Sequence, residues 1–215
     1  MKKPFLLTAS LRSPFARRIR LALDRLNLPY ELNLIDVFNP PADFLDKNPL
    51  GLVPILEFPD GRILTDSNML IEVLHENYGG ELGGDFGGLW PKDPLLRFES
   101  RQSSVLSVGI MTAMVARHLE HLRKQPDSDW MLEHETAIEG ALARLKSTPA
   151  RVWTENSGHN QALYDFTVVI DYMNLRAPKL AERGFHNSEK DFGEAFNMIR
   201  KLKMLPAFQN SHPPN

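Results

Sequence analysis

A glycine-rich stretch divides this chain of 215 residues into two parts with different residue patterns. Residues 79–88 contain six glycines, a composition that is typical of a loop or linker. Strand and helix patterns alternate before this stretch, whereas the periodicity after it is helical throughout. The sequence therefore predicts a small α/β domain over residues 1–80, a linker over 81–93 and an all-helical domain over 94–215.

The expected elements of the first domain follow the order β-α-β, short helix, β-β-α. Helical spacing of apolar residues over 15–26 follows a short apolar run, and residues 30–34 alternate with a period of two. Residues 53–58 and 62–65 flank a Pro-Asp-Gly turn and predict a hairpin, followed by a helix over 69–78. In the second domain we expect helices over 91–124, 127–147, 160–180 and 188–205.

The overall composition argues against several function classes. The net charge is −2 and the isoelectric point is about 6.4, so bulk electrostatics give no reason to expect a nucleic acid or an acidic membrane as a partner. No apolar run approaches the roughly 20 residues of a membrane helix. The apolar run near the N-terminus is too short for the core of a signal peptide. We therefore expect a cytoplasmic protein.

The chain contains no cysteine. Disulfides, thiolate metal sites and a nucleophilic thiol supplied by the protein are therefore excluded. His118 and His121 lie three residues apart, a spacing that places both on one helix face. The sequence offers no third ligand beside them, so we expect no metal.

A proline stands inside the run of β-forming residues at 53–58. Proline has no N–H to donate to a sheet, so Pro54 argues against an ordinary strand. A cis Val53–Pro54 peptide bond at the edge of the sheet would resolve the conflict, because it would turn the N–H and C=O groups of Val53 outward. An extended ligand lying alongside would then pair with both groups.

Four stretches, in order and at their spacing, resemble the cytosolic glutathione S-transferase family over nearly the whole chain. They are the turn and first helix at 10–21 with the pattern Ser-Pro-Phe-x-Arg, the Val-Pro segment at 48–56, the acidic-Ser motif at 64–71 and the Leu-Trp-Pro segment at 89–94. The pattern is most similar to bacterial transferase-like proteins. The resemblance implies a thioredoxin-like N-terminal domain, the all-helical C-terminal domain of the family, and a homodimer.

The resemblance also implies that glutathione is the co-substrate and that its own sulfur is the nucleophile, which suits a chain without cysteine. A thiol with a pKa of about 8.5 is mostly protonated at neutral pH, so the protein must stabilise the thiolate. Two serines are candidates for the hydroxyl donor: Ser13, which precedes Pro14 at a helix start, and Ser10. We favour Ser13, and the alternative is that Ser13 serves only as a helix cap.

Two further segments are expected to hold the tripeptide. By resemblance, Val53, presented by Pro54, pairs with the cysteinyl backbone of glutathione. The residue before it is Leu52, where many relatives have a lysine or another polar group. This departure puts one contact to the glycyl end of the tripeptide in question.

The second of these segments is the acidic-Ser pair. Ser67 and the free N–H groups of a helix start suit the γ-glutamyl carboxylate, and Asp66 suits the ammonium group. The alternative is that Thr65 or Asp66 only caps the helix.

The electrophilic substrate is expected to contact Leu11 from the first domain and Met111, Met114 and His118 from one helix of the second. Methionine adapts to varied apolar shapes. The same spacing is typical of a packed core, which is the alternative for at least half of these residues.

Two other features of the sequence concern charge and folding. Arginines lie in or beside the first helix, and we interpret most of them as a solvated helix face, with Arg12 or Arg17 as candidates to steer an anionic tripeptide. Asp165 resembles the buried aspartate of the family's helical-domain folding motif. The usual hydroxyl residue three positions earlier is Ala162 here, and Asn160 is the candidate to replace it as a cap.

These features predict an enzyme, a glutathione transferase that activates the glutathione thiolate for attack on an electrophilic small molecule. The alternative is a non-catalytic binding or regulatory protein on the same scaffold, similar to the stringent starvation proteins that contact RNA polymerase. In those proteins the glutathione site is often degraded. Here Val53-Pro54 and Asp66-Ser67 are intact, which favours the enzyme.

Overall fold

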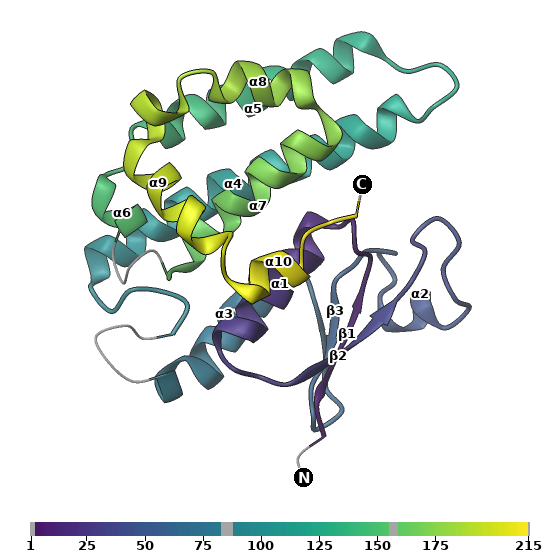
Figure 1. Ribbon diagram of the computed structural model, residues 1–215. Helices are drawn as coiled ribbons and strands as arrows, with labels where there is room; N and C mark the ends of the chain where they lie inside the picture. The colour runs from purple at the N-terminus through teal and green to yellow at the C-terminus, as the bar shows by residue number, and fades with distance from the viewer. Residues whose placement is uncertain (1–2, 83–87, 155–158, 215) are drawn as a thin grey trace. The chain divides into compact units, whose positions relative to one another are not determined.

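The computed structural model describes residues 3–82, 88–154 and 159–214. Within them an α/β part is followed by a helical part (Figure 1), which confirms the expected fold class. The first compact unit extends to Leu89 and also includes Leu205–Pro214, and the second comprises Trp90–Met204. We expected the C-terminal segment to belong to the helical domain, but it belongs to the first unit. Residues 83–87 of the expected linker lie outside the described residues.

The first unit is built on a four-stranded mixed sheet with the order β2-β1-β3-β4. Its elements are β1 (Phe5–Ala9), α1 (Pro14–Arg25), β2 (Tyr30–Leu34), α2 (Phe44–Lys47), β3 (Ile55–Glu57), β4 (Ile63–Thr65), α3 (Ser67–Tyr78), the 3-10 helix η1 (Gly79–Leu82) and α10 (Pro206–Asn210). β1 and β2 are parallel, whereas β3 is antiparallel to β1 and to β4. Helices α1 and α3 pack against each other on one side of the sheet, and α2 lies on the other side (Figure 1).

The core of this unit combines apolar side chains from the sheet and from both helices. Leu7 and Leu56 are register partners on β1 and β3, and both are fully buried. Ile19 of α1 and Leu70 of α3 are fully buried too. Each such side chain contributes about 1.5–3 kcal/mol of hydrophobic stabilisation relative to an exposed position. The helical spacing of apolar residues in α1 therefore serves to attach that helix to the sheet.

Pro54 precedes a strand and does not lie inside one. β3 begins at Ile55, two residues later than the β-forming run predicts, and the Val53–Pro54 bond is cis, as expected. β3 does not form the edge of the sheet, because β1 and β4 pair with its two sides. The missing N–H is tolerated because both ladders start at Ile55, after the proline.

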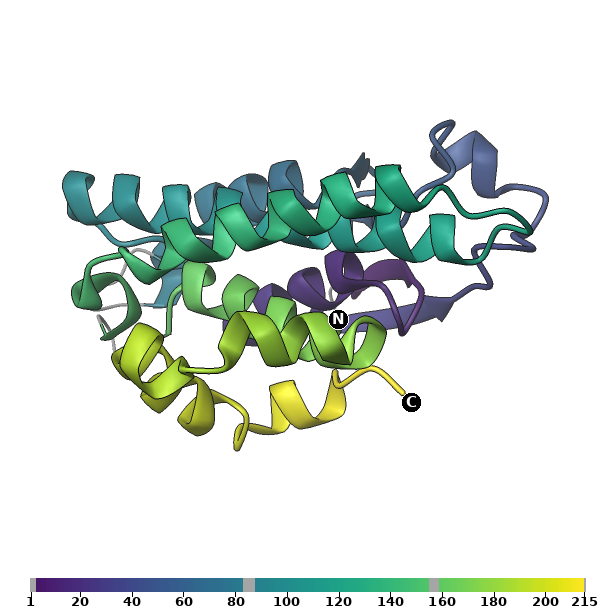
Figure 2. The ribbon, with the colours of Figure 1, turned by 90° about the horizontal axis from the view of Figure 1, so that it is seen from above.

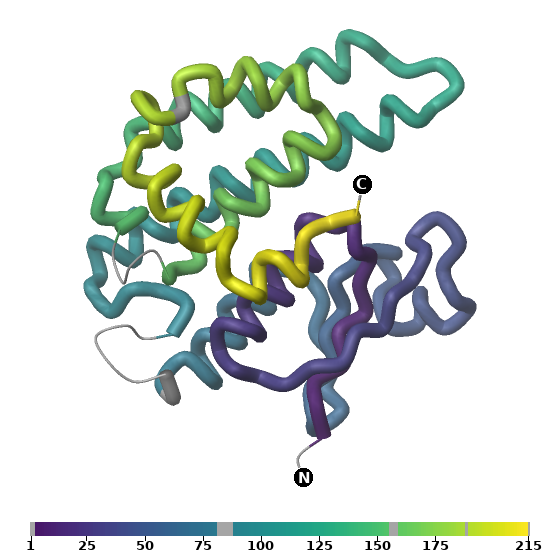
Figure 3. Tube along the Cα trace, viewed as in Figure 1, coloured from purple at the N-terminus to yellow at the C-terminus, as the bar shows by residue number. Residues whose placement is uncertain are grey.

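The C-terminal segment packs on α1, as the yellow end of the tube in Figure 3 shows. Arg17 donates from Nε to Ser211 Oγ at 3.3 Å, and Arg20 donates from Nη2 to the carbonyl oxygen of Asn210 at 2.9 Å. These two arginines are 3% and 7% exposed. The prediction of a solvated arginine face is therefore wrong for them, because a segment about 190 residues away in sequence covers this side of the helix.

Within its described residues, the second unit consists of helices and the segments that connect them. Its helices are α4 (Pro94–His121), α5 (Ser128–Lys146), α6 (Ala150–Thr154), α7 (Gln161–Arg176), α8 (Pro178–Phe185) and α9 (Ser188–Leu202). The long helices α4 and α5 run side by side, and α7 packs along α4 (Figure 2). No helix among the described residues is long and apolar enough to cross a membrane.

Prolines divide the helices where the sequence predicted continuous ones. The helix expected over 160–180 ends at Arg176, and α8 starts at Pro178. Ala177, between them, has φ −151° and ψ 65°, because proline excludes helical backbone at the residue before it and has no N–H to donate. Likewise the helix expected over 188–205 ends at Leu202, and Pro206 begins α10.

Candidate functional site

Three segments of the first unit leave the sheet at the same end. Thr8 on β1 is the register partner of Ile55 on β3, and Ile55 is also the partner of Thr65 on β4. This row contains the last residue of β4, the first residue of β3 and the last but one of β1. The chain segments that adjoin the row are therefore neighbours in space, although they are far apart in sequence.

These neighbouring segments carry the residues that the sequence predicts to bind glutathione. They are the turn after β1 with Ser10 and Ser13, the segment before β3 with Leu52, Val53 and Pro54, and the start of α3 with Asp66 and Ser67. The strand register thus brings these predicted residues together at one end of the sheet.

Ser13 lies at the N-cap of α1 and Pro14 is the first helical residue. The Ser13 hydroxyl oxygen accepts a hydrogen bond from the Ala16 N–H at 3.2 Å, and the Ser13 N–H donates to the Ser10 carbonyl at 3.0 Å, which closes the turn. The expected capping role is therefore present. Because the oxygen acts as an acceptor, the hydroxyl proton remains available to a second group, at the positive end of the helix dipole.

Val53 lies in the loop between α2 and β3. Within the described residues, neither its N–H nor its C=O is paired with another backbone group. The buried Asn48 holds this loop, since its Nδ2 donates to the Leu52 carbonyl at 2.8 Å and its Oδ1 accepts from the Leu50 N–H at 3.1 Å. The Leu52 side chain is exposed. The loop is therefore fixed, and within the described residues the backbone N–H and C=O groups of Val53 are open to pairing with another backbone.

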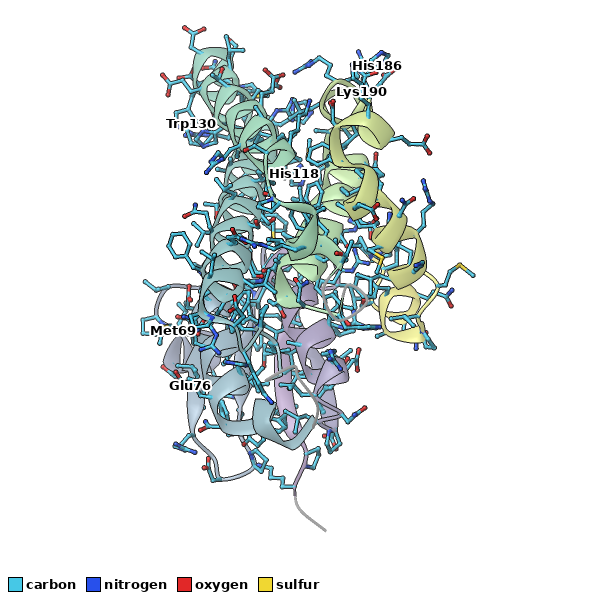
Figure 4. The ribbon with its side chains drawn as sticks, turned by 90° about the vertical axis from the view of Figure 1, so that its left-hand side faces the viewer. Met69, Glu76, His118, Trp130, His186 and Lys190 are labelled. Atoms are coloured by element: carbon cyan, nitrogen blue, oxygen red, sulfur yellow. The ribbon has the colours of Figure 1, made fainter. Side chains whose placement is uncertain are left out.

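Asp66 caps α3 and has an uncommon backbone conformation, with φ 70° and ψ 118°. Its Oδ1 accepts from the N–H groups of Asn68 at 2.9 Å and Met69 at 3.0 Å, so the capping alternative is realised. A non-glycine residue with positive φ costs about 1–3 kcal/mol, which the two cap bonds help to offset. In Figure 4, Met69 and Glu76 mark the exposed side of this helix.

Ser67, the first residue of α3, is buried and contacts an arginine that the sequence reasoning assigned to solvent. Arg18 of α1 is 1% exposed. Its Nη1 donates to Ser67 Oγ at 3.0 Å and to Asn68 Oδ1 at 2.7 Å. A signal was present in the sequence: Arg18 stands four residues before Ala22, an apolar position of the expected helix, so it borders the apolar face of that helix.

The sequence of this unit matches a known domain. Residues 7–82 match the family model described as "Glutathione S-transferase, N-terminal domain". The α/β domain of the chain therefore belongs to the glutathione S-transferase family. This confirms the resemblance that the sequence motifs indicated.

Two curated relatives are similar to the chain over part of their length. Glutathione S-transferase omega-1 of Mus musculus is 29% identical over 170 residues, which span 79% of this chain and 66% of the mouse protein. The probable cytosolic glutathione S-transferase DHAR1 of Oryza sativa subsp. japonica is 42% identical over 65 residues, which span 30% of each chain. The chain thus matches less than two thirds of the length of either relative.

A solved structure shares the fold of this chain over both domains. The glutathione S-transferase of Methylobacterium radiotolerans has a TM-score of 0.82 at 24% identity. The match covers 99% of this chain and 96% of that one. The α/β domain and the helical domain therefore both have the family's fold.

The residues expected at the electrophile site are divided between the two units of the chain. Leu11, in the turn after β1, is exposed. On α4, Met111 and Met114 are fully buried, whereas His118 is partly exposed. A fully buried side chain offers no surface to a ligand, so the structure favours the core alternative for the two methionines.

Proposed function

We propose that this glutathione S-transferase family member binds glutathione and stabilises its thiolate for attack on an electrophilic small molecule. The observation that carries the proposal is the row Thr8–Ile55–Thr65, which gathers the Ser13 turn, the Val53 backbone and the start of α3 at one end of the sheet. The Methylobacterium radiotolerans structure is described as a complex with glutathione sulfonate, which supports this ligand class.

In the proposed mechanism, the Ser13 hydroxyl donates its free proton to the glutathione sulfur. Lowering the pKa of a thiol by two units takes about 2.7 kcal/mol. A hydrogen bond to a charged group contributes about 1.5–3 kcal/mol, and the start of a helix adds about 0.3–1 kcal/mol, so the range of the two effects together includes the required value. The thiolate then forms the bond to the electrophilic carbon, and the leaving group or the displaced electron pair departs from that carbon.

The remaining segments hold the tripeptide in this proposal. The backbone of Val53 pairs with the cysteinyl residue, and Ser67 with Asp66 receives the γ-glutamyl end. Leu52 offers only a backbone group and an apolar side chain to the glycyl end. We also propose a cytoplasmic location and a role in detoxification, because glutathione is the thiol that keeps the cytosol reducing.

Calorimetric titration with glutathione, followed by ultraviolet difference spectra of the bound thiol across pH, tests the proposal. We expect binding, with a thiolate pKa well below that of free glutathione. Binding without a pKa shift would contradict catalysis and favour a carrier or sensor. If millimolar glutathione does not bind, the proposal fails, and the non-catalytic partner-binding alternative takes its place.

We propose a homodimer on the basis of an apolar stripe on α4, formed by Leu95, Phe98 and Val105. Their side chains are 57%, 66% and 65% exposed. The stripe borders a pocket of about 290 Å³ whose lining also includes Leu106 and Pro149. Large exposed apolar side chains at helical spacing are typical of an interface. Sedimentation equilibrium should show a dimer that Phe98→Glu dissociates, and a monomeric wild-type protein at all concentrations would refute it.

A further inference from the structure

Arg18 is the charged side chain that contacts the start of α3 from inside the first unit. Its guanidinium is 1% exposed and reaches two consecutive residues of α3, Ser67 at 3.0 Å and Asn68 at 2.7 Å. Both bonds come from the same nitrogen, Nη1. Arg18 therefore acts on α3 at the two positions that follow the Asp66 cap.

The chemistry of the guanidinium fixes the direction of both hydrogen bonds. Guanidinium groups have donors and no acceptor. The Ser67 oxygen must therefore accept, and its own proton must point to another group. The Asn68 side chain must present its carbonyl oxygen to Arg18, and its NH₂ group must face the opposite way. A side chain without donors, such as methionine, would impose neither direction.

The helix cap leaves these two polar groups free for a ligand. Asp66 Oδ1 already accepts from the N–H groups of Asn68 and Met69, so neither the Ser67 hydroxyl nor the Asn68 amide is needed as a cap. Asn68 is exposed, and Ser67 is the first residue of the helix. The start of α3 thus presents the Ser67 O–H and the Asn68 NH₂ group, and the hydrogen bonds from Arg18 set the orientation of both.

We propose, on the basis of the function proposed above, that Arg18 is a positioning residue for the γ-glutamyl end of glutathione. It turns the Ser67 hydroxyl proton and the Asn68 NH₂ group toward the α-carboxylate, and it does not touch the ligand itself. Asn68 is then a binding residue for that carboxylate. Together with the Ser67 N–H, these groups form a set of donors for an anion at a helix start.

The test compares two ligands in the full-length protein. One is glutathione, and the other is 4-aminobutanoyl-cysteinylglycine, which keeps the ammonium group and lacks the α-carboxylate. In Arg18→Met the Kd for glutathione should rise about tenfold, since methionine has no donor and the oriented charge-assisted contact is lost. The Kd for the analogue should stay within about twofold, because the wild type and the variant both lack that contact when the analogue is bound. Arg20→Met is the matched control, as Arg20 is a buried arginine of α1 that donates to Asn210.

The outcomes separate this proposal from the proposed function. If the wild-type protein binds neither ligand, the proposed function fails. If it binds glutathione and Arg18→Met weakens both ligands equally, Arg18 is only structural and the positioning role is overturned. If Arg18→Met does not fold, Asn68→Ala, a change at an exposed residue, replaces it. Asn68→Ala should weaken glutathione but not the analogue, and unchanged glutathione binding would refute the proposal.

Discussion

The guanidinium of Arg20 donates a hydrogen bond of 2.9 Å to the carbonyl oxygen of Asn210, at the end of the last helix of the chain. Arg17 makes a parallel contact with Ser211 Oγ at 3.3 Å. The carbonyl groups in the last turn of a helix have no partner within that helix. Arg20 supplies one from α1, and so the C-terminal segment becomes part of the N-terminal domain.

Replacing Arg20 with methionine should lower the free energy of unfolding by about 1–3 kcal/mol, because a buried hydrogen bond to a charged donor is lost. Truncation after Met204 should also destabilise the first unit, since it removes α10. The two effects should not add fully: in the truncated protein, Arg20→Met should cost less, because the contact with Asn210 is already gone and only the contact with Tyr30 and the charge of Asp24 remain. Urea unfolding of the wild type, the point variant, the truncated protein and the truncated variant measures the non-additivity. Additive effects would show that Arg20 does not stabilise the protein through the C-terminal segment.

The burial of Arg17 and Arg20 shows why part of the fold was not predictable from local sequence. The apolar period of α1 correctly identified the face that packs on the sheet, with Ile19 and Ala22 buried. That period carries no information about the opposite face. The opposite face is covered by α10, which is joined to α1 only through tertiary structure. From the local sequence, charged residues that are covered in this way cannot be distinguished from a solvent-exposed helix face.

The buried serines of α4 offer a matched pair for testing the helical unit. Ser104 donates to Oδ2 of the fully buried Asp165 at 2.5 Å, and Gln161 donates to Oδ1 at 2.7 Å. Ser100 is equally buried, but its hydroxyl has no partner among the described residues. Ser104→Ala should destabilise the protein by about 1–3 kcal/mol, whereas Ser100→Ala should be neutral or stabilising.

Both substitutions exchange serine for alanine in one helix, so the gain in helix propensity is common to the two variants. The difference between their free energies of unfolding therefore isolates the hydrogen bond to Asp165. Chemical unfolding of the two variants provides the measurement. Equal effects would mean that the contact between Ser104 and Asp165 contributes nothing to stability.

Asn160 caps α7 in the manner that the sequence indicated. Its Oδ1 accepts from the Leu163 N–H at 3.1 Å, and its Nδ2 donates to the Val152 carbonyl at 2.7 Å. Asn160→Ala loses both contacts at a buried site and should cost about 2 kcal/mol. Asn187 stands at the same position before α9 but makes no cap hydrogen bond, so Asn187→Ala should change stability little. Thermal unfolding of both variants tests the contrast, and similar losses would contradict it.

The candidate site shows the same division between local and tertiary information. Local motifs predict the turn or helix start at Ser13, Pro54 and Ser67. The strand register then brings the three segments together at one end of the sheet. Arg18 holds the start of α3 through Ser67, and Asn48 holds the loop before β3 through Leu52. Nothing in the local sequence distinguishes either of them from an ordinary polar residue. The spacing of Met111 and Met114 is compatible with a ligand pocket and with a packed core. Their complete burial in the structure favours the core, and this burial could not be predicted from the spacing.

The acid stability of the helical unit should depend on Glu135. Burial raises the pKa of this carboxyl group, but hydrogen bonds from Arg183 and Arg117, each at 2.8 Å, outweigh burial and hold the pKa below its ordinary value of 4.5. A lowered folded-state pKa means that the stabilisation is present above pH 4.5 and is lost as the pH falls through the lowered value. The contacts join α5 to α4 and α8.

Glu135→Gln should therefore destabilise the protein at pH 7, and its difference from the wild type should shrink as the pH falls below about 4.5. The exposed Glu133→Gln on the same helix is the control. Unfolding curves over this pH range measure the effect. A difference that stays constant across the range would show that the Glu135 charge does not stabilise the fold.

Ser13 has two separable roles, as a helix cap and as the proposed donor to the thiolate. Ser13→Ala removes both, so the free energy of unfolding should fall by about 1 kcal/mol, and the pKa of the bound glutathione thiol should rise by about one unit or more. Ser13→Asp keeps a capping oxygen at the start of α1 but has no proton to donate at neutral pH. It should retain stability while the thiol pKa rises at least as far.

Difference spectra of bound glutathione and unfolding curves on the same variants measure the two roles separately. Ser10→Ala is the control, because Ser10 takes part in the turn through its carbonyl oxygen, which this change leaves in place. If the thiol pKa rises in Ser10→Ala and not in Ser13→Ala, the donor is Ser10. If it rises in neither while glutathione still binds, the thiolate depends on backbone donors and the helix dipole alone.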